Sequence, residues 1–247
     1  MTSVSVRQLA KSFITQEGSS LQVLKDFSFC ADDGDFVCLL GPSGCGKSTT
    51  LNILAGLVPK DAGDIALGTT PNGKARISYV FQEPRLLNWK KVEDNLGFVL
   101  TAMRVPAEEK ARRIAHYLRL VDLQDYASYY PLALSGGMQQ RVSIARALCV
   151  LPDLLLMDEP FSNLDEFTAR DLRRKLLEIW ELERKTVIFI THNALEAVFL
   201  ANKIFLVSSK PATVFEQVGV DLPRPREFED PNLLALQKKV ITLLGVR

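Results

Sequence analysis

The stretch "GPSGCGKST", residues 41–49, is the strongest indicator of the fold. It matches the pattern G-x-x-x-x-G-K-[ST], with the apolar run FVCLL directly before it and the helical pattern TTLNILAGL soon after it. A strand, a glycine-rich turn and a helix in this order direct main-chain N–H groups at a phosphate, and the helix adds its positive N-terminal end. The stretch therefore predicts a nucleotide phosphate site in an α/β protein.

Each residue of this phosphate loop has an expected role. The Lys47 ammonium would reach the β- and γ-phosphates of the nucleotide, and the Ser48 hydroxyl would bind Mg²⁺. The other expected contacts to the nucleotide come from Gly41, Pro42, Ser43, Gly44, Cys45, Gly46 and Thr49.

A second motif, "LLLMDEP" at residues 154–160, supplies acidic groups. Three leucines predict a buried strand, and Asp158 stands at its carboxyl end, where ligands gather in open α/β sheets. Asp158 is expected to hold the shell of Mg²⁺, and Glu159 is a candidate base for an attacking water.

Bulk composition narrows the class of protein. The chain has 247 residues, 47% of them hydrophobic, and a formal net charge of +1, so no global basic field indicates nucleic acid as a partner. Its four cysteines show no CxxC spacing, and Cys30 and Cys38 are expected to be small core residues. We expect no signal peptide and no membrane span, so a membrane role would need another chain as anchor.

Hydrophobic patterns set the organisation along the chain. Short apolar runs predict strands, and in 166–182 apolar residues recur at helical spacing. The stretch 88–150 shows helical patterns without a convincing strand, so we expect a helical lobe inserted into the α/β core. From about residue 209 we expect a proline-rich connection, then a last helix capped by Asp230 and stopped at Gly245.

The stretch "LSGGMQQR", residues 134–141, resembles the signature sequence of ATP-binding cassette (ABC) proteins. That resemblance implies a P-loop NTPase with a RecA-like, mostly parallel sheet, an N-terminal antiparallel β subdomain and the inserted helical subdomain. It also implies that Ser135, Gly136 and Gly137 meet the ATP bound by the phosphate loop of a second subunit, so two copies would pair head to tail.

Further residues match other motifs of the family. Phe13 resembles the aromatic residue that stacks on adenine, and Gln82 resembles the glutamine that contacts Mg²⁺ and the attacking water. The stretch "SNLD", which ends at Asp165, resembles the loop that crosses the dimer interface in this family. His192 resembles the switch histidine that touches the γ-phosphate. His116, in a helical pattern, is interpreted as structural.

The resemblance covers residues 1–210, which we therefore interpret as one ABC ATPase domain with its helical subdomain at about 88–150. Residues 211–247 are interpreted as a C-terminal extension.

Three functions compete within this family. The chain could be the energy-coupling subunit of a membrane transporter, a soluble ATPase acting on ribosomes or DNA, or a nucleotide-gated scaffold that does not hydrolyse ATP. The soluble types resemble this chain less, because it has one cassette and no long coiled coil. A scaffold would lack the base, whereas Glu159, Gln82 and His192 are all present.

The stretch "EPRLLNWKKVEDNL" favours the transporter. In transporters of this family the region receives a short coupling helix of the permease, and Leu86, Leu87 and Trp89 are suitable anchors for it. The alternative is that these side chains belong to the core of the lobe.

The residues of this stretch, the length of the chain and the tail "LPRPR" resemble those of the ATP-binding subunits of bacterial nitrate/sulfonate/taurine importers. This resemblance implies a peripheral subunit on the cytoplasmic face of the inner membrane, integral-membrane permease partners and, indirectly, a periplasmic binding protein. Some relatives carry pyrimidine precursors of thiamine, which remains an alternative substrate class.

Overall fold

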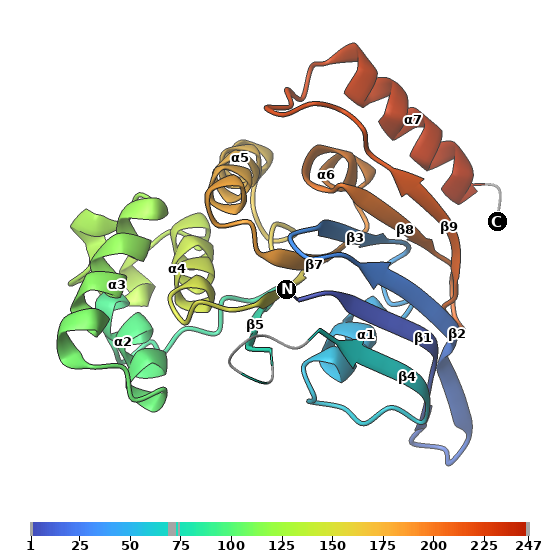
Figure 1. Cartoon of the computed structure of the whole chain (residues 1–247), viewed down its shortest axis with the longest axis horizontal. Coiled ribbons are helices and arrows are strands. Elements are labelled where there is room, and N and C mark those ends of the chain that lie inside the picture. The colour runs from blue at the N-terminus through green and yellow to red at the C-terminus, as the bar shows by residue number, and fades with distance from the viewer. Residues whose placement is uncertain (1, 69–72, 74, 246–247) are drawn as a thin grey trace. The chain divides into compact units, whose positions relative to one another are not determined.

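The computed structural model describes residues 2–68, 73 and 75–245 (Figure 1), and the chain forms two compact units. The first unit holds residues 1–75 and 185–247, and the second holds residues 76–184. Among the described residues, no helix has the length and apolar character that crossing a bilayer requires.

The first unit begins with an antiparallel sheet. Its strands are β1 (Val4–Ile14), β2 (Ser20–Ala31) and β4 (Ala62–Leu67), in the order β2-β1-β4. Strand β1 lies centrally, and both of its pairings are antiparallel with irregular register. This sheet agrees with the predicted antiparallel β subdomain at the N-terminus.

Four further strands of the first unit lie side by side in the order β7 (Thr186–Thr191), β3 (Phe36–Leu40), β8 (Lys203–Val207) and β9 (Val214–Gly219). Strand β3 is parallel to β7 and β8, and all five of its residues are buried, which explains the unbroken apolar run before the phosphate loop. Strand β9 pairs antiparallel with β8 in a stretch we predicted as a connection. The prediction missed it because VFEQVG is short and half-exposed.

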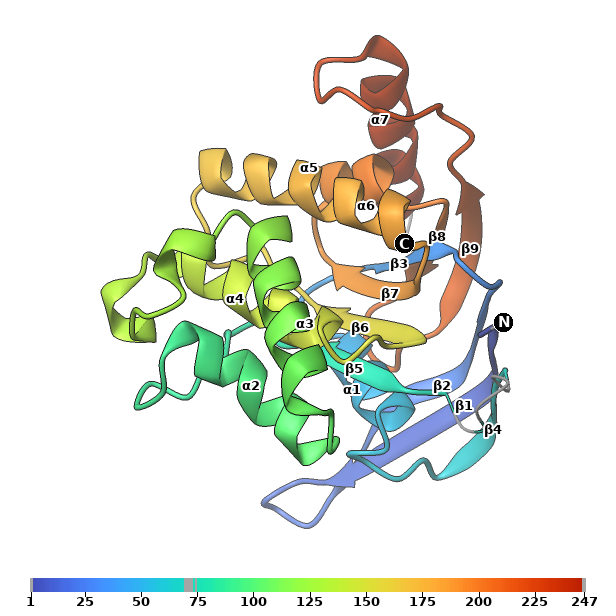
Figure 2. The same cartoon turned by 60° about the vertical axis from the view of Figure 1, so that its left-hand side comes forward.

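The described residues of this unit also form the helices α1 (Lys47–Leu54), α6 (Ala194–Leu200) and α7 (Pro231–Gly245). Figure 2 shows α6 and α7 as neighbours, and the side chain of Asp230 accepts from Asn232 N at 2.8 Å at the start of α7. Cys38 is buried as predicted, but Cys30 is exposed, because it points out from the edge strand β2.

The second unit holds two parallel strands and a group of helices. Strands β5 (Ile77–Val80) and β6 (Leu154–Asp158) pair in parallel. Between them come α2 (Val92–Ala102), α3 (Ala107–Leu120), two short 3₁₀ turns at Gln124–Tyr126 and Pro131–Ala133, and α4 (Gly136–Leu148). Helix α5 (Glu166–Glu183) follows β6 and buries its apolar stripe, including Trp180.

Candidate functional site

The phosphate loop joins β3 to α1 within the first unit. The Lys47 ammonium donates to Gly41 O at 2.9 Å and Pro42 O at 2.8 Å, and Lys47 is only 3% exposed. A buried lysine held over its own loop by carbonyl groups is positioned as a fixed positive charge. Ser48 in the first turn of α1 is exposed, so its hydroxyl stands where a cation could approach.

Two positions of this loop, Gly41 and Gly46, have no room for a side chain. Gly46 has a φ of +129°, and a Cβ there would lie 2.8 Å from Val23 Cγ1. A Cβ on Gly41 would lie 2.5 Å from Val207 O, so the loop passes close to the end of β8. Side chains at these two positions would therefore displace the loop from its supports.

His192 lies in the same unit as the phosphate loop. It directly follows β7, and because β7 is parallel to β3, both segments leave the sheet at the same edge. Gly41 N donates to Thr191 O at 3.4 Å, and a pocket of about 260 Å³ is lined by Gly41, Pro42 and His192 among others. His192 is exposed, as a group that contacts a ligand must be.

Asp158 lies in the second unit, at the carboxyl end of β6. Its carboxylate accepts a hydrogen bond of 3.0 Å from the hydroxyl of Tyr79 on β5. Burial, followed by the negative charge of Asp158, raises the pKa of Tyr79 well above its usual value. Tyr79 thus stays a neutral donor that orients this carboxylate, and it also stacks on Phe81 with ring centroids 4.3 Å apart.

Glu159 and Gln82 are joined through Ser162, the first residue of "SNLD". Gln82 Nε2 donates to Ser162 Oγ at 3.0 Å, and Ser162 Oγ donates to Glu159 O at 2.9 Å. Glu159 has a φ of +41°, which is uncommon for a residue with a side chain and is a feature of functional turns. Tyr79 carries no motif of its own, so only the pairing of β5 with β6 reveals it. Ser162 belongs to "SNLD", but no role was predicted for it.

The signature stretch opens α4, also in the second unit. Ser135 is the N-cap and its Oγ accepts from Met138 N at 3.3 Å, so Gly136 and Gly137 form the first turn. Ser135 and Gly136 are exposed, which leaves a positive helix end available to an anion. A Cβ on Gly137 would lie 2.3 Å from Thr168 Cγ2 of α5, so this glycine allows two helices to approach.

Phe13 and Asp165 occupy separate places. Phe13, on β1, is 40% exposed with the ammonium of Lys11 5.3 Å from its ring centroid. Asp165 caps α5 and accepts from the hydroxyl of Thr168 at 2.6 Å and from its N–H at 3.1 Å. These bonds hold the pKa of the Asp165 carboxyl below its usual range.

The predicted partner residues lie in the segment before α2. Trp89 is 75% exposed, whereas Leu86 and Leu87 are half-buried, so the tryptophan side chain protrudes most of the three. Buried Asn95 holds this segment through four side-chain hydrogen bonds to the main chain of Leu87, Lys90 and Lys91.

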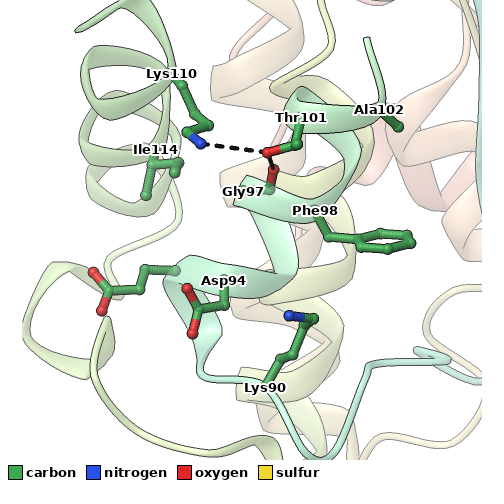
Figure 3. A pocket seen from close by; sticks show the side chains of 9 residues that line it. Lys90, Asp94, Gly97, Phe98, Thr101, Ala102, Lys110 and Ile114 are labelled. Atoms are coloured by element: carbon green, nitrogen blue, oxygen red, sulfur yellow. Dashed lines mark hydrogen bonds between the residues drawn. The ribbon is translucent and has the colours of Figure 1, made fainter. Parts of the chain in front are cut away.

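A pocket of about 480 Å³ lies on α2 and α3 of the same unit, and Figure 3 shows the side chains around it. Phe98, 54% exposed, and Ile114 supply apolar surface, while Lys110 donates to Thr101 Oγ1 at 3.3 Å across the two helices.

Taken together, a phosphate loop after a buried parallel strand, an acidic strand end and a glycine-led helix define a nucleotide-hydrolysing α/β protein. Comparison with known proteins identifies the family within this class. A family profile described as ABC transporter matches residues 24–162, more than half of the chain. The chain belongs to the ABC transporter family.

Individual relatives agree with this assignment. The chain is 40% identical over 242 residues to the aliphatic sulfonates import ATP-binding protein SsuB of Bacillus cereus, covering 96% of this chain and 94% of that protein. It is 37% identical over 243 residues to an uncharacterized ABC transporter ATP-binding protein, MJ0412, of Methanocaldococcus jannaschii, covering 98% and 91%.

A solved structure shares the fold. The dimeric, post-hydrolysis state of the ATP-binding cassette MJ0796 bound to ADP and Pi has 28% sequence identity to this chain. Its TM-score is 0.76, with 89% of this chain and 100% of that chain covered. The predicted P-loop NTPase fold is thereby confirmed, and the chain is an ATP hydrolase of the cassette type.

Proposed function

We propose that this cassette powers an importer of small organic anions, with aliphatic sulfonates as the first candidate. One observation carries the proposal: the 40% identity to a sulfonate import ATP-binding protein extends over nearly the full length of both chains. The alignment therefore extends well beyond the phosphate loop and the signature stretch. The cassette would work at the cytoplasmic face of the inner membrane, beside permease subunits and a periplasmic binding protein.

In the proposed catalytic cycle, two copies pair head to tail and each ATP lies between the phosphate loop of one copy and Ser135, Gly136 and Gly137 of the other. The N-terminal ends of α1 and α4 support this, because the first turn of a helix offers N–H groups to phosphate oxygens. Phe13 would stack on the adenine, and Asp165 would lie at the dimer interface. In this proposal residues 1–210 form the cassette, with its helical subdomain at about 88–150, and residues 211–247 form an extension.

The donor set suits magnesium. A serine hydroxyl, an amide oxygen and a carboxylate, from Ser48, Gln82 and Asp158, are the oxygen ligands that Mg²⁺ prefers. Mg²⁺ in nucleotide sites is commonly held by one or two protein oxygens together with phosphates and water. When bound, Mg²⁺ neutralises charge that develops on the phosphates.

The protein's own groups would carry out the remaining steps. Glu159 would orient and deprotonate the water, since the bond from Ser162 to its carbonyl fixes its turn. Lys47 and His192 would stabilise the charge on the γ-phosphate, and Gln82 would convey hydrolysis to the permease.

The head-to-tail arrangement can be tested by mixing two inactive variants. Lys47→Ala removes the phosphate contact and Ser135→Arg blocks the signature, so each variant alone should hydrolyse no ATP. A mixed dimer contains one composite site in which both residues are intact, and the mixture should regain hydrolysis. A mixture as inactive as its components would refute the arrangement, because a site built within one copy cannot be repaired this way.

The permease surface can be tested with a matched pair of variants. Trp89→Ala should lower recovery of a multi-span membrane protein with the tagged chain, whereas Leu182→Ala, at an equally exposed position on α5, should not. Both should bind ATP normally. Equal recovery with both variants would contradict the role of Trp89, and recovery of ribosomal or DNA-repair proteins alone would favour the soluble ATPase.

The substrate class can be tested by growth. Cells lacking this cassette should fail to grow on ethanesulfonate as the sole sulfur source yet grow on sulfate. Normal growth on ethanesulfonate would overturn the sulfonate assignment, and a requirement for thiamine would favour the pyrimidine precursors.

A further inference from the structure

The tail of the chain binds the carboxyl end of α6, the helix that follows His192. Arg226 is only 4% exposed, and its guanidinium donates to the carbonyl groups of Val198, Phe199, Ala201, Val220 and Leu222 at 2.8–3.3 Å. Arg224 donates to Leu200 O. The two arginines therefore bind the last carbonyl groups of α6, which have no partner within the helix.

These contacts matter because the carbonyl groups at the carboxyl end of α6 need hydrogen-bond donors from outside the helix. Val198, Phe199, Leu200 and Ala201 are all 0% exposed, so water does not reach their carbonyl groups easily. Phe228 of the tail stacks on Phe199, with ring centroids 4.0 Å apart and planes 6° apart. A planar guanidinium with several donors is the group best suited to collect carbonyls at a helix C-terminus.

The N-terminal end of α6 lies just after His192. Asn193, next to His192, caps the helix by accepting from Leu195 N at 2.9 Å and Glu196 N at 3.3 Å. Thr191, before His192, donates from its hydroxyl to buried Glu196. Both neighbours of His192 are thus bonded to the first turn of α6, and a shift of this seven-residue helix would move the histidine.

The final helix reaches the same segment from another direction. Leu244, near the end of α7, lines the pocket that also contains Gly41, Pro42 and His192. The tail therefore contacts α6 at its carboxyl end through residues 224–228 and approaches His192 itself through α7.

We propose that Arg226 is a positioning residue: the tail fixes α6 and thereby sets the place of His192 beside the phosphate loop. The effect on hydrolysis rests on the proposed contact of His192 with the γ-phosphate. Breaking the tail contact should lower kcat by about 10- to 100-fold, as small misplacements of catalytic groups do. KM for ATP should change less than about twofold, because the contacts of Lys47 remain.

The position of His192 can be read directly by NMR. The chain contains two histidines, and His116 lies on α3 in the other unit. In histidine-labelled protein, Arg226→Met should shift the imidazole signals of His192 and leave those of His116 in place. Lys239→Met, which removes a positive charge from the exposed face of α7, should shift neither. His116→Gln assigns the two sets.

Two further variants guard against misfolding. Phe228→Leu removes the ring stack but keeps an apolar side chain, and Leu244→Ala alters the other contact. Each should shift only the His192 signals, in protein whose His116 signals remain native. Arg226→Lys, which keeps the charge and loses the fork, should give a smaller shift and a smaller loss of kcat than Arg226→Met.

Unchanged His192 signals in Arg226→Met and Phe228→Leu would overturn the proposal, as would equal shifts of both histidines. Kinetics separate this from the proposed function. If His192→Ala hydrolyses ATP at the normal rate, the role of His192 fails while the NMR result still decides whether the tail positions it. If that variant is slow, adding Arg226→Met should slow it no further, whereas a multiplied loss would contradict action through His192.

Discussion

Asn95 is the side chain that holds the proposed permease-binding segment, and Asn95→Ala tests that view. Four hydrogen bonds would be lost, to Leu87 N, Leu87 O, Lys90 O and Lys91 O. Leu87 O and Lys91 O keep a second donor, the main-chain N–H groups of Lys90 and Asn95. Leu87 N and Lys90 O would depend on water.

The magnitude follows from those two groups. A polar group left without its partner on burial costs about 1–3 kcal/mol. Because Leu87 and Lys90 are half-buried and water can partly replace the bond, we expect the low end for each, about 2 kcal/mol in total. For a chain of this length that corresponds to a fall in Tm of about 4–8 °C.

Thermal unfolding followed by circular dichroism is the assay, with two companion variants. Asn88→Ala, at an exposed position of the same segment, should change stability by less than about 0.5 kcal/mol. Asn95→Asp keeps the shape but turns an acceptor toward three carbonyls, so it should destabilise at least as much as Asn95→Ala. A normal Tm for Asn95→Asp would refute the reasoning, because the bonds and not the volume are its basis.

Two other predictions rest on single contacts. Gly137→Ala should destabilise the protein by about 1–3 kcal/mol in urea unfolding, because its Cβ would overlap Thr168. Gly136→Ala should be tolerated, because the nearest atom to its Cβ is 3.9 Å away. Equal effects of the two variants would contradict the close approach of the two helices. Iodoacetamide at neutral pH should label exposed Cys30 well before Cys149, because burial raises the pKa of the Cys149 thiol to about 12; mass spectrometry that finds Cys149 modified first would contradict this.

Motifs whose chemistry depends on consecutive residues were predictable from the sequence. The phosphate loop, the acidic strand end and the signature turn each combine a local conformation with a fixed residue order, so their elements follow from local physics. The strands flanking the phosphate loop were equally clear, since β3 and β7 are buried throughout and read as unbroken apolar runs.

Contacts between distant segments were not predictable in this way. Tyr79 and Asp158 meet because β5 pairs with β6, yet 79 positions separate them and neither neighbourhood signals the other. Strand β9 was missed because its pairing with β8 decides its conformation more than its own propensity does. Cys30 was assigned to the core from an apolar run that in fact alternates between two faces of a sheet.

The tail shows why a resemblance and a physical unit can have different limits. The sequence motifs of the cassette family all lie within residues 1–210, and "DLPRPREFEDP" has the composition of a linker. Arginine is seldom buried unless its donors are all engaged, and the bonds of Arg226 to α6, Val220 and Leu222 together satisfy that condition. Those bonds join 224–228 to the helix after His192, so removing residues beyond 210 would expose the end of α6 and leave β8 without β9. Because the tail packs as part of the first unit, the physical unit extends beyond the residues that carry the motifs.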